Sequence, residues 1–252
     1  MLVGLLLFSS ALLLTTRTTA AERVVSLNLC TDQYLLALAP ERAVAVTFMA
    51  RDAMLSALAD KAAGMATVRA DAEAVIALRP DLVLAGPWGA RPTLAALERR
   101  GLRVERLTPP QDFPAIRTAT RHMAALLGEP ARGELLLAAM EAVLAAHPPG
   151  PPRPAIALEP RGFSAGPGAL RDAVLRQAGL RNAAGGEQLG LEALAARAPV
   201  LLVVAEAPTT PSRATDLLRH PAIAAHPRRV VPAALTVCGG PWTARAVALL
   251  TP

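Results

Sequence analysis

EAVIALRPDLVLA, at residues 73–85, and EALAARAPVLLVVA, at residues 192–205, are two versions of one pattern. Each begins with a Glu, continues with helix-forming residues, reaches a Pro seven residues later and ends in an apolar run. Pro cannot continue a helix, and an unbroken run of Leu, Val and Ala is typical of a strand buried in a parallel sheet. The repeat therefore predicts a helix followed by a buried strand in each half of the chain, and two lobes of one design.

The residues around the first copy alternate between strand-like and helix-like stretches. We expect strands at residues 24–27, 43–47, 82–85 and 104–107. Helices are expected at residues 34–39, 72–78 and 92–100, where Pro or Gly ends each of them. This alternation predicts an α/β lobe with a mostly parallel sheet over residues 21–111.

A helical segment without strands follows at residues 112–152. Pro130 suits the first turn of a helix, and residues 130–147 would form a rod about 27 Å long, which can link two small lobes. Strand and helix patterns then resume, with strands at 155–158, 200–204 and 230–231 and helices at 170–178 and 191–196. We expect a second α/β lobe over residues 153–252.

Composition excludes several classes of protein. The chain has 252 residues, 53% of them apolar, which is enough to bury a core and excludes disorder. Its formal net charge is +6, but no basic cluster is longer than a pair of residues, and aromatic residues make up only 3%. Bases would have few rings on which to stack, so we expect no nucleic-acid partner.

The first 20 residues are typical of a secretory signal peptide. MLVGLLLFSSALLL is apolar but shorter than the roughly 20 residues that span a bilayer, and a Thr- and Ala-rich stretch follows it. A short membrane anchor is the alternative. Cys30 lies too far from the apolar run to be a lipoprotein cleavage site. We expect cleavage near Ala21 and export to the periplasm, an oxidising compartment.

Common signatures of catalysis and of metal binding do not occur in the sequence. There is no Gly-x-Ser-x-Gly elbow, phosphate-binding loop or Cys-x-x-Cys pair, and the four histidines lack zinc-ligand spacing. The turn at residues 166–168 lacks the third Gly of a dinucleotide fingerprint. We therefore expect a binding protein with no catalytic residues and no resident metal or cofactor.

The two cysteines, Cys30 and Cys238, follow the first strand of one lobe and the last strand of the other. Open parallel sheets bind ligands at such carboxyl ends. Three interpretations stay open: a disulfide, which is usual for two cysteines in an exported protein, free thiols that face a ligand, or buried inert thiols. An alternative function is a periplasmic thiol enzyme that uses Cys30, with Asp32 and Arg51 near it.

Several of these stretches together resemble one known family. RVVSLNLCTDQ, EAVIALRPDLVLAG, the long linking helix, FSAGPG and CGGPW are similar to the periplasmic substrate-binding proteins of ABC importers for vitamin B12, haem and iron-siderophores. The resemblance implies two Rossmann-like lobes joined by one rigid helix, with a ligand cleft between them. It also implies a monomer that delivers a corrinoid, haem or iron chelate to a membrane permease.

The resemblance also assigns roles to single residues. It implies that the ligand lies among loops after the strands, at the segment 48–51 and at Asn28, Leu29, Cys30, Asp32, Arg51, Trp88, Arg91, Phe163, Cys238 and Trp242. Each Trp lies in a loop rich in Gly and Pro, where it either stacks on a planar ligand or plugs the edge of its lobe. Glu73 and Glu192 are implied to dock onto the permease, although either could simply favour the start of its helix.

Overall fold

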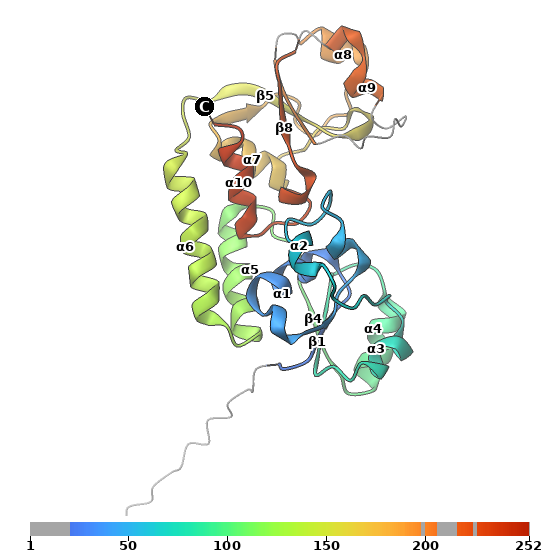
Figure 1. Cartoon of the computed structure of the whole chain (residues 1–252). Helices are drawn as coiled ribbons and strands as arrows, with labels where there is room; N and C mark the ends of the chain where they lie inside the picture. Colours follow the sequence, from blue (N-terminus) through green and yellow to red (C-terminus); the bar gives the residue numbers. More distant parts are fainter. Residues whose placement is uncertain (1–20, 198–199, 206–215, 224–225, 252) are drawn as a thin grey trace, which may run out of the picture.

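The computed structural model describes residues 21–197, 200–205, 216–223 and 226–251. The expected signal peptide, residues 1–20, lies outside the described residues. Figure 1 shows two lobes, one above the other, with a long helix running along one side of both. None of the described helices is long and apolar enough to cross a membrane.

The N-terminal lobe contains a parallel four-stranded sheet in the order β2-β1-β3-β4. Its strands are β1 (Val24–Ser26), β2 (Ala43–Ala45), β3 (Leu82–Ala85) and β4 (Arg103–Arg106), and its helices are α1 (Leu29–Leu38), α2 (Ala59–Ala62), α3 (Ala72–Ala77) and α4 (Arg91–Arg99). The two central strands are buried, with core residues on both faces of the sheet. The apolar run at residues 82–85 is therefore a central strand, as expected.

The C-terminal lobe repeats this topology with the order β6-β5-β7-β8, again all parallel. Its elements are β5 (Arg153–Leu158), α7 (Leu170–Gln177), β6 (Leu180–Asn182), α8 (Leu191–Ala195), β7 (Leu201–Ala205), α9 (Asp216–Arg219), β8 (Arg228–Val231) and α10 (Ala244–Ala248). In both lobes the first strand lies between the second and the third. The two copies of the sequence repeat contain β3 and β7, which are the third strands of their sheets, so the repeat marks equivalent positions. The expected α/β fold of two parallel-sheet lobes is confirmed.

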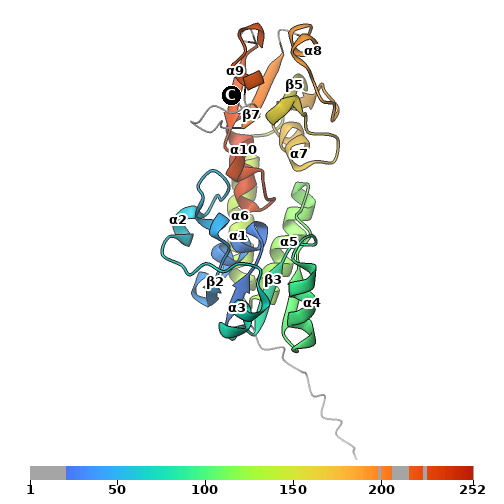
Figure 2. The ribbon, with the colours of Figure 1, turned by 90° about the vertical axis from the view of Figure 1, so that its right-hand side faces the viewer.

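Two antiparallel helices, α5 (Phe113–Leu126) and α6 (Pro130–Ala146), connect the lobes. They approach closely at Gly133, where an added Cβ would lie 2.5 Å from the Cβ of Ala124. Ion pairs also join them, with Arg117 Nε 2.6 Å from Glu141 Oε1. The two views of the molecule agree that α6 passes from the N-terminal lobe to the C-terminal lobe (Figures 1 and 2). It is the expected linking helix.

A second connection between the lobes was not expected. Residues 238–243 lead through a 3₁₀ turn, η6 (Pro241–Thr243), into α10. Cys238 and Trp242 lie in the hydrophobic core of the N-terminal lobe, whereas Val247, on α10, lies in the core of the C-terminal lobe. The division at residue 153 therefore places one segment in the wrong core, because residues 238–243 cross back to the first lobe.

Candidate ligand cleft

The loops that follow the parallel strands of both lobes meet near the junction of the lobes. Gln111, which precedes α5, accepts a hydrogen bond at Oε1 from the Leu170 N–H at the start of α7, over 3.3 Å. Asn28 begins α1, and its side-chain oxygen accepts from the Cys30 N–H at 2.9 Å. The segment after β4 thus contacts the start of α7, at the ends of the sheets where open α/β folds bind ligands.

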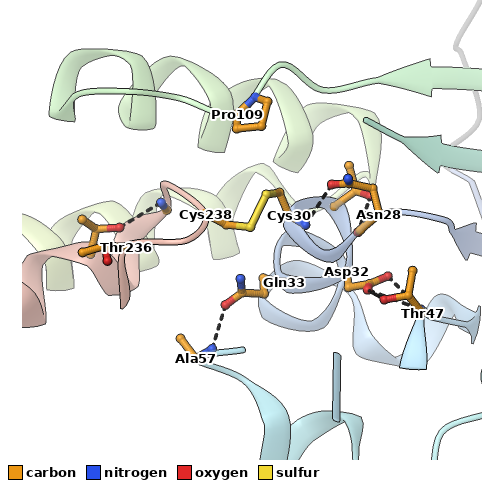
Figure 3. Close-up of a disulfide and its surroundings, with 12 residues drawn as sticks. Asn28, Cys30, Asp32, Gln33, Thr47, Ala57, Pro109, Thr236 and Cys238 are labelled. Carbon is orange, nitrogen blue, oxygen red and sulfur yellow. Dashed lines mark hydrogen bonds between the residues drawn. A yellow bond between two sulfur atoms is a disulfide. The ribbon is translucent and has the colours of Figure 1, made fainter. Parts of the chain in front are cut away.

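Cys30 and Cys238 form a disulfide at this junction. Their Sγ atoms are 2.11 Å apart and their Cα atoms 5.2 Å apart. Figure 3 shows the bridge between α1 and the segment that includes Thr236, with Pro109 on one side and Gln33 on the other. Both cysteines are buried, and the described chain contains no free cysteine. The two interpretations with free thiols are therefore wrong, and so is a thiol enzyme, because no thiolate is present to act as a nucleophile.

Asp32 is a structural residue instead of a ligand contact. Its side chain is fully buried, and its carboxylate accepts hydrogen bonds from the Thr47 N–H, at 3.2 Å, and from the Thr47 hydroxyl (Figure 3). Burial raises the pKa of Asp32 to about 6, against the smaller lowering effect of hydrogen bonds from Ser26 and Thr47. The expected place of Asp32 on the cleft surface is wrong. The carboxyl instead holds the loop after β2 against α1.

Leu29 and Trp242 also lie in the core. Leu29 packs among buried residues of the N-terminal lobe. The Trp242 side chain is 7% exposed, and its ring centroid is 5.4 Å from that of Tyr34. Its indole N–H donates to the Cys238 carbonyl at 3.0 Å. Stacking on a ligand is not available to a ring enclosed in this way, and the ring does not plug the edge of its own lobe either, because it is buried in the core of the N-terminal lobe.

The other expected cleft residues are on the surface. Trp88 is 72% exposed and follows β3, and Phe163 is 47% exposed and follows β5. Arg51 and Arg91 are exposed in the same kind of loop. The turn after Trp88 is sharp, because Gly89 and Ala90 both have positive φ, and Ala90 then begins α4.

Two further exposed residues belong with this group. Phe48, at the start of the 3₁₀ helix η2 (Phe48–Arg51), is 70% exposed. It lies inside the expected segment 48–51, although it was not singled out. Arg161 was missed. It lies in the turn η3 (Pro160–Gly162) after β5 with a φ of 63°, and the only signal in the sequence is a Pro-Arg-Gly turn directly after a strand.

Other side chains that could bind metal are engaged elsewhere. His226 is buried and bonds to the backbone carbonyls of Leu194 and Val200. His122, which is exposed on α5, has its Nε2 2.9 Å from Glu105 Oε1. Across the described ranges no group of three or more His, Cys, Asp or Glu side chains could hold a metal ion.

Glu73 and Glu192 occupy equivalent positions at opposite ends of the molecule. Each is exposed in the first turn of the helix that precedes the third strand of its lobe, α3 or α8. Figures 1 and 2 place α3 at the end of the N-terminal lobe and α8 at the end of the C-terminal lobe. Neither acid lies among the loops of the cleft.

Comparisons with known proteins agree with this architecture. The family described as periplasmic binding protein matches residues 24–228. A periplasmic haem-binding protein from Pseudomonas aeruginosa is 27% identical, with a TM-score of 0.67 and coverage of 91% of each chain. The apo haem-binding protein RhuT from Roseiflexus sp. RS-1 is 25% identical, with a TM-score of 0.68 and coverage of 90% of this chain and 95% of that one.

A third solved structure shares the fold at lower identity. It is an ABC-type Fe³⁺-hydroxamate transport protein from Saccharomonospora viridis DSM 43017, 20% identical, with a TM-score of 0.67 and coverage of 92% of each chain. No curated protein sequence matches the chain. Because the family match extends over most of the two lobes and the linking helices between them, this chain belongs to the periplasmic binding protein family.

Proposed function

We propose that this protein captures a metal-containing chelate in the cleft between its lobes and delivers it, without chemical change, to the permease of an ABC importer. The main support is the set of exposed aromatic rings in loops after β2, β3 and β5. A large ring in water forgoes the free energy that its burial would give, so exposed rings in loops that follow parallel strands favour a ligand-binding surface. The haem and iron-hydroxamate proteins of the same fold make such a chelate the first class to test.

The proposal places the protein in the periplasm as a monomer, after removal of residues 1–20. Calorimetric titration of the mature, disulfide-bonded chain with haemin, with ferric siderophores and with cyanocobalamin tests the proposed binding. We expect at least one of these complexes to bind with one saturable site. Failure of all three classes to bind would refute the proposal.

Glu73 and Glu192 are proposed to contact basic residues of the permease. Their exposure and their equivalent positions in the two lobes support this role. Glu73→Arg and Glu192→Arg should each leave chelate binding unchanged and reduce uptake by cells that carry the importer. Glu22→Arg is the control, because Glu22 is also an exposed acid but lies outside both helices. A loss of chelate binding in either variant would show that the acid belongs to the binding site.

A further inference from the structure

Three segments that follow strands of the two sheets each carry one exposed aromatic ring and one exposed Arg, at most three residues apart. The pairs are Phe48 with Arg51 after β2, Trp88 with Arg91 after β3, and Phe163 with Arg161 after β5. Two pairs come from the N-terminal lobe and one from the C-terminal lobe. The same combination of chemistry is thus repeated on both sides of the cleft.

The exposed rings are confined to these loops. The described chain holds six aromatic residues, and the other three, Phe113, Tyr34 and Trp242, are buried in the cores. A sequence with so few aromatic residues therefore leaves half of the described rings in water, all at carboxyl ends of strands. A flat or conjugated ligand surface would bury them, and stacked rings add stabilisation beyond the buried area.

The neighbouring guanidinium groups are available for anions. Within the described residues, Arg91 and Arg161 form no ion pair, and Arg51 donates only to the backbone carbonyl of Met65. The acids in these loops are committed elsewhere: Asp52 accepts from the Met54 N–H, and Glu159 lies 3.5 Å from the buried Arg171. The three arginines outnumber the one acid, Asp52, that is not paired with another cation, so these segments carry excess positive charge. Arg binds carboxylate and phenolate oxygens through charge-assisted hydrogen bonds.

The same loops offer no imidazole, phenolate or thiolate to a metal. The chain has one Tyr, and Tyr34 is 0% exposed. Its two cysteines are bonded to each other. Imidazole, phenolate, thiolate and thioether are the side chains that hold haem iron in proteins. Three thioethers are near these loops: Met54 is exposed after η2, whereas Met49 and Met65 are half-buried and pack against the core.

All four histidines are described, none of them lies within these loops, and three are engaged away from them. His122 pairs with Glu105 of β4, and His226 is buried among backbone carbonyls. His147 follows the end of α6 and bonds to the Val143 carbonyl. His220 follows α9, and α9 packs against the turn after β5, where a Cβ added at Gly162 would lie 3.0 Å from the Leu217 side chain.

We propose that the cargo is an anionic chelate with aromatic or conjugated faces, whose metal is fully coordinated by the chelator's own donor atoms. A ferric tris-catecholate has this chemistry: it is trianionic, its rings face outward, and its six oxygens complete the coordination of the iron. The rings of Phe48, Trp88 and Phe163 would pack on its faces, and Arg51, Arg91 and Arg161 would meet its charged oxygens. This inference rests on the proposed function and narrows its substrate class.

Four probes separate this inference from the broader proposal: a ferric tris-catecholate, the cationic tris-hydroxamate ferrioxamine B, haemin and cyanocobalamin. Each is titrated into the intact chain. We expect the tris-catecholate to bind most tightly, at least tenfold more tightly than ferrioxamine B, with an affinity that falls as salt is added. Binding of ferrioxamine B or cyanocobalamin alone would overturn the inference and leave the proposed function standing. Binding of none of the four would overturn both.

Variants test the role of the arginines. Arg51→Gln, Arg91→Gln and Arg161→Gln should each weaken tris-catecholate binding by about tenfold, the effect of one charge-assisted hydrogen bond. Arg99→Gln, at the far end of α4 from Arg91, is the matched control and should change nothing. Unchanged affinity in all three variants would refute the inference. So would tight haemin binding with a low-spin spectrum that is lost in Met54→Leu or in His220→Ala, because it would show that the protein itself ligates the metal.

Discussion

At the scale of single residues, Asp32 links the stability of the N-terminal lobe to pH. Burial raises its pKa in the folded protein from 3.8 to about 6. Between these values the folded protein binds a proton that the unfolded chain does not, so stability falls as pH rises from about 4 to 6. Above pH 6 both states are ionised, and the folded state keeps a buried charge that is only partly compensated by Thr47.

Asp32→Asn should therefore raise the free energy of unfolding at pH 7, by about 1–3 kcal/mol. An amide keeps an acceptor for the Thr47 N–H and removes the charge. Urea denaturation from pH 4 to 7 measures the effect, and the decline in stability over this range should be smaller in the variant. Asp71→Asn, at the exposed start of α3, is the control. A variant that is less stable than the parent at pH 7 would contradict this account of Asp32.

Trp88 and Trp242 show the limit of sequence reasoning at this scale. Both lie in loops rich in Gly and Pro, so the local sequence predicts the same surroundings for both rings. The difference is tertiary, because residues 238–243 enter the core of the other lobe, and no local pattern indicates that contact. Arg161 was missed for a related reason, since one Arg in a turn carries no periodic signal.

The two tryptophans should respond oppositely to substitution. Trp242→Ala should lower the free energy of unfolding by about 3–5 kcal/mol, because it empties a packed site beside Tyr34. Trp88→Ala should change stability by less than about 0.5 kcal/mol and weaken chelate binding. Chemical denaturation and titration of both variants test this contrast. Equal stability of the two variants would mean that Trp242 is not in the core.

At the scale of elements, strands and helices with a strong apolar pattern could be predicted, whereas the short polar strand β6 could not. The buried strand at residues 82–85 and the helix after Pro130 lie where expected. The edge strand β6 was not expected, because it has three residues and two of them, Arg181 and Asn182, are polar. Helix α1 begins at Leu29 and not at residue 34, since Asn28 caps it.

The crossing segment 238–243 depends on close backbone contact at Gly239. A Cβ there would lie 2.3 Å from the Pro110 carbonyl oxygen. Gly239→Ala should therefore force the segment away from Pro110 and lower the melting temperature by several degrees, since overpacking costs about 1–3 kcal/mol. Gly150→Ala is the matched control, because nothing lies within 4 Å of the added Cβ. If both variants have the same melting temperature as the parent protein, the contact between Gly239 and Pro110 is not as close as described.

At the scale of the whole molecule, the linking helices and the disulfide hold the lobes together at two separate places. The bridge joins residues 208 positions apart, one at the start of α1 and one after the last strand. A crosslink that closes so long a loop restricts the unfolded chain strongly. The sequence left the state of the cysteines open, because their pairing depends on how two distant lobes meet.

Replacing both cysteines by Ser should lower the free energy of unfolding by about 2–5 kcal/mol. Reductant should destabilise the parent by a similar amount and leave the double variant unchanged. Thermal melts with and without dithiothreitol measure both effects. A parent protein that is indifferent to reductant, with alkylation showing that the thiols have become free, would contradict a stabilising role for the bridge.

The central claim is that a metal chelate is held between the two lobes by the loops after their strands. Anomalous diffraction at the iron edge, from crystals grown with a ferric tris-catecholate, tests it most directly. The account predicts one strong iron peak between the lobes, with chelator atoms in contact with Phe48, Trp88 and Phe163 and with no protein atom coordinating the metal. An iron peak elsewhere on the protein, or one coordinated by a protein side chain, would contradict it.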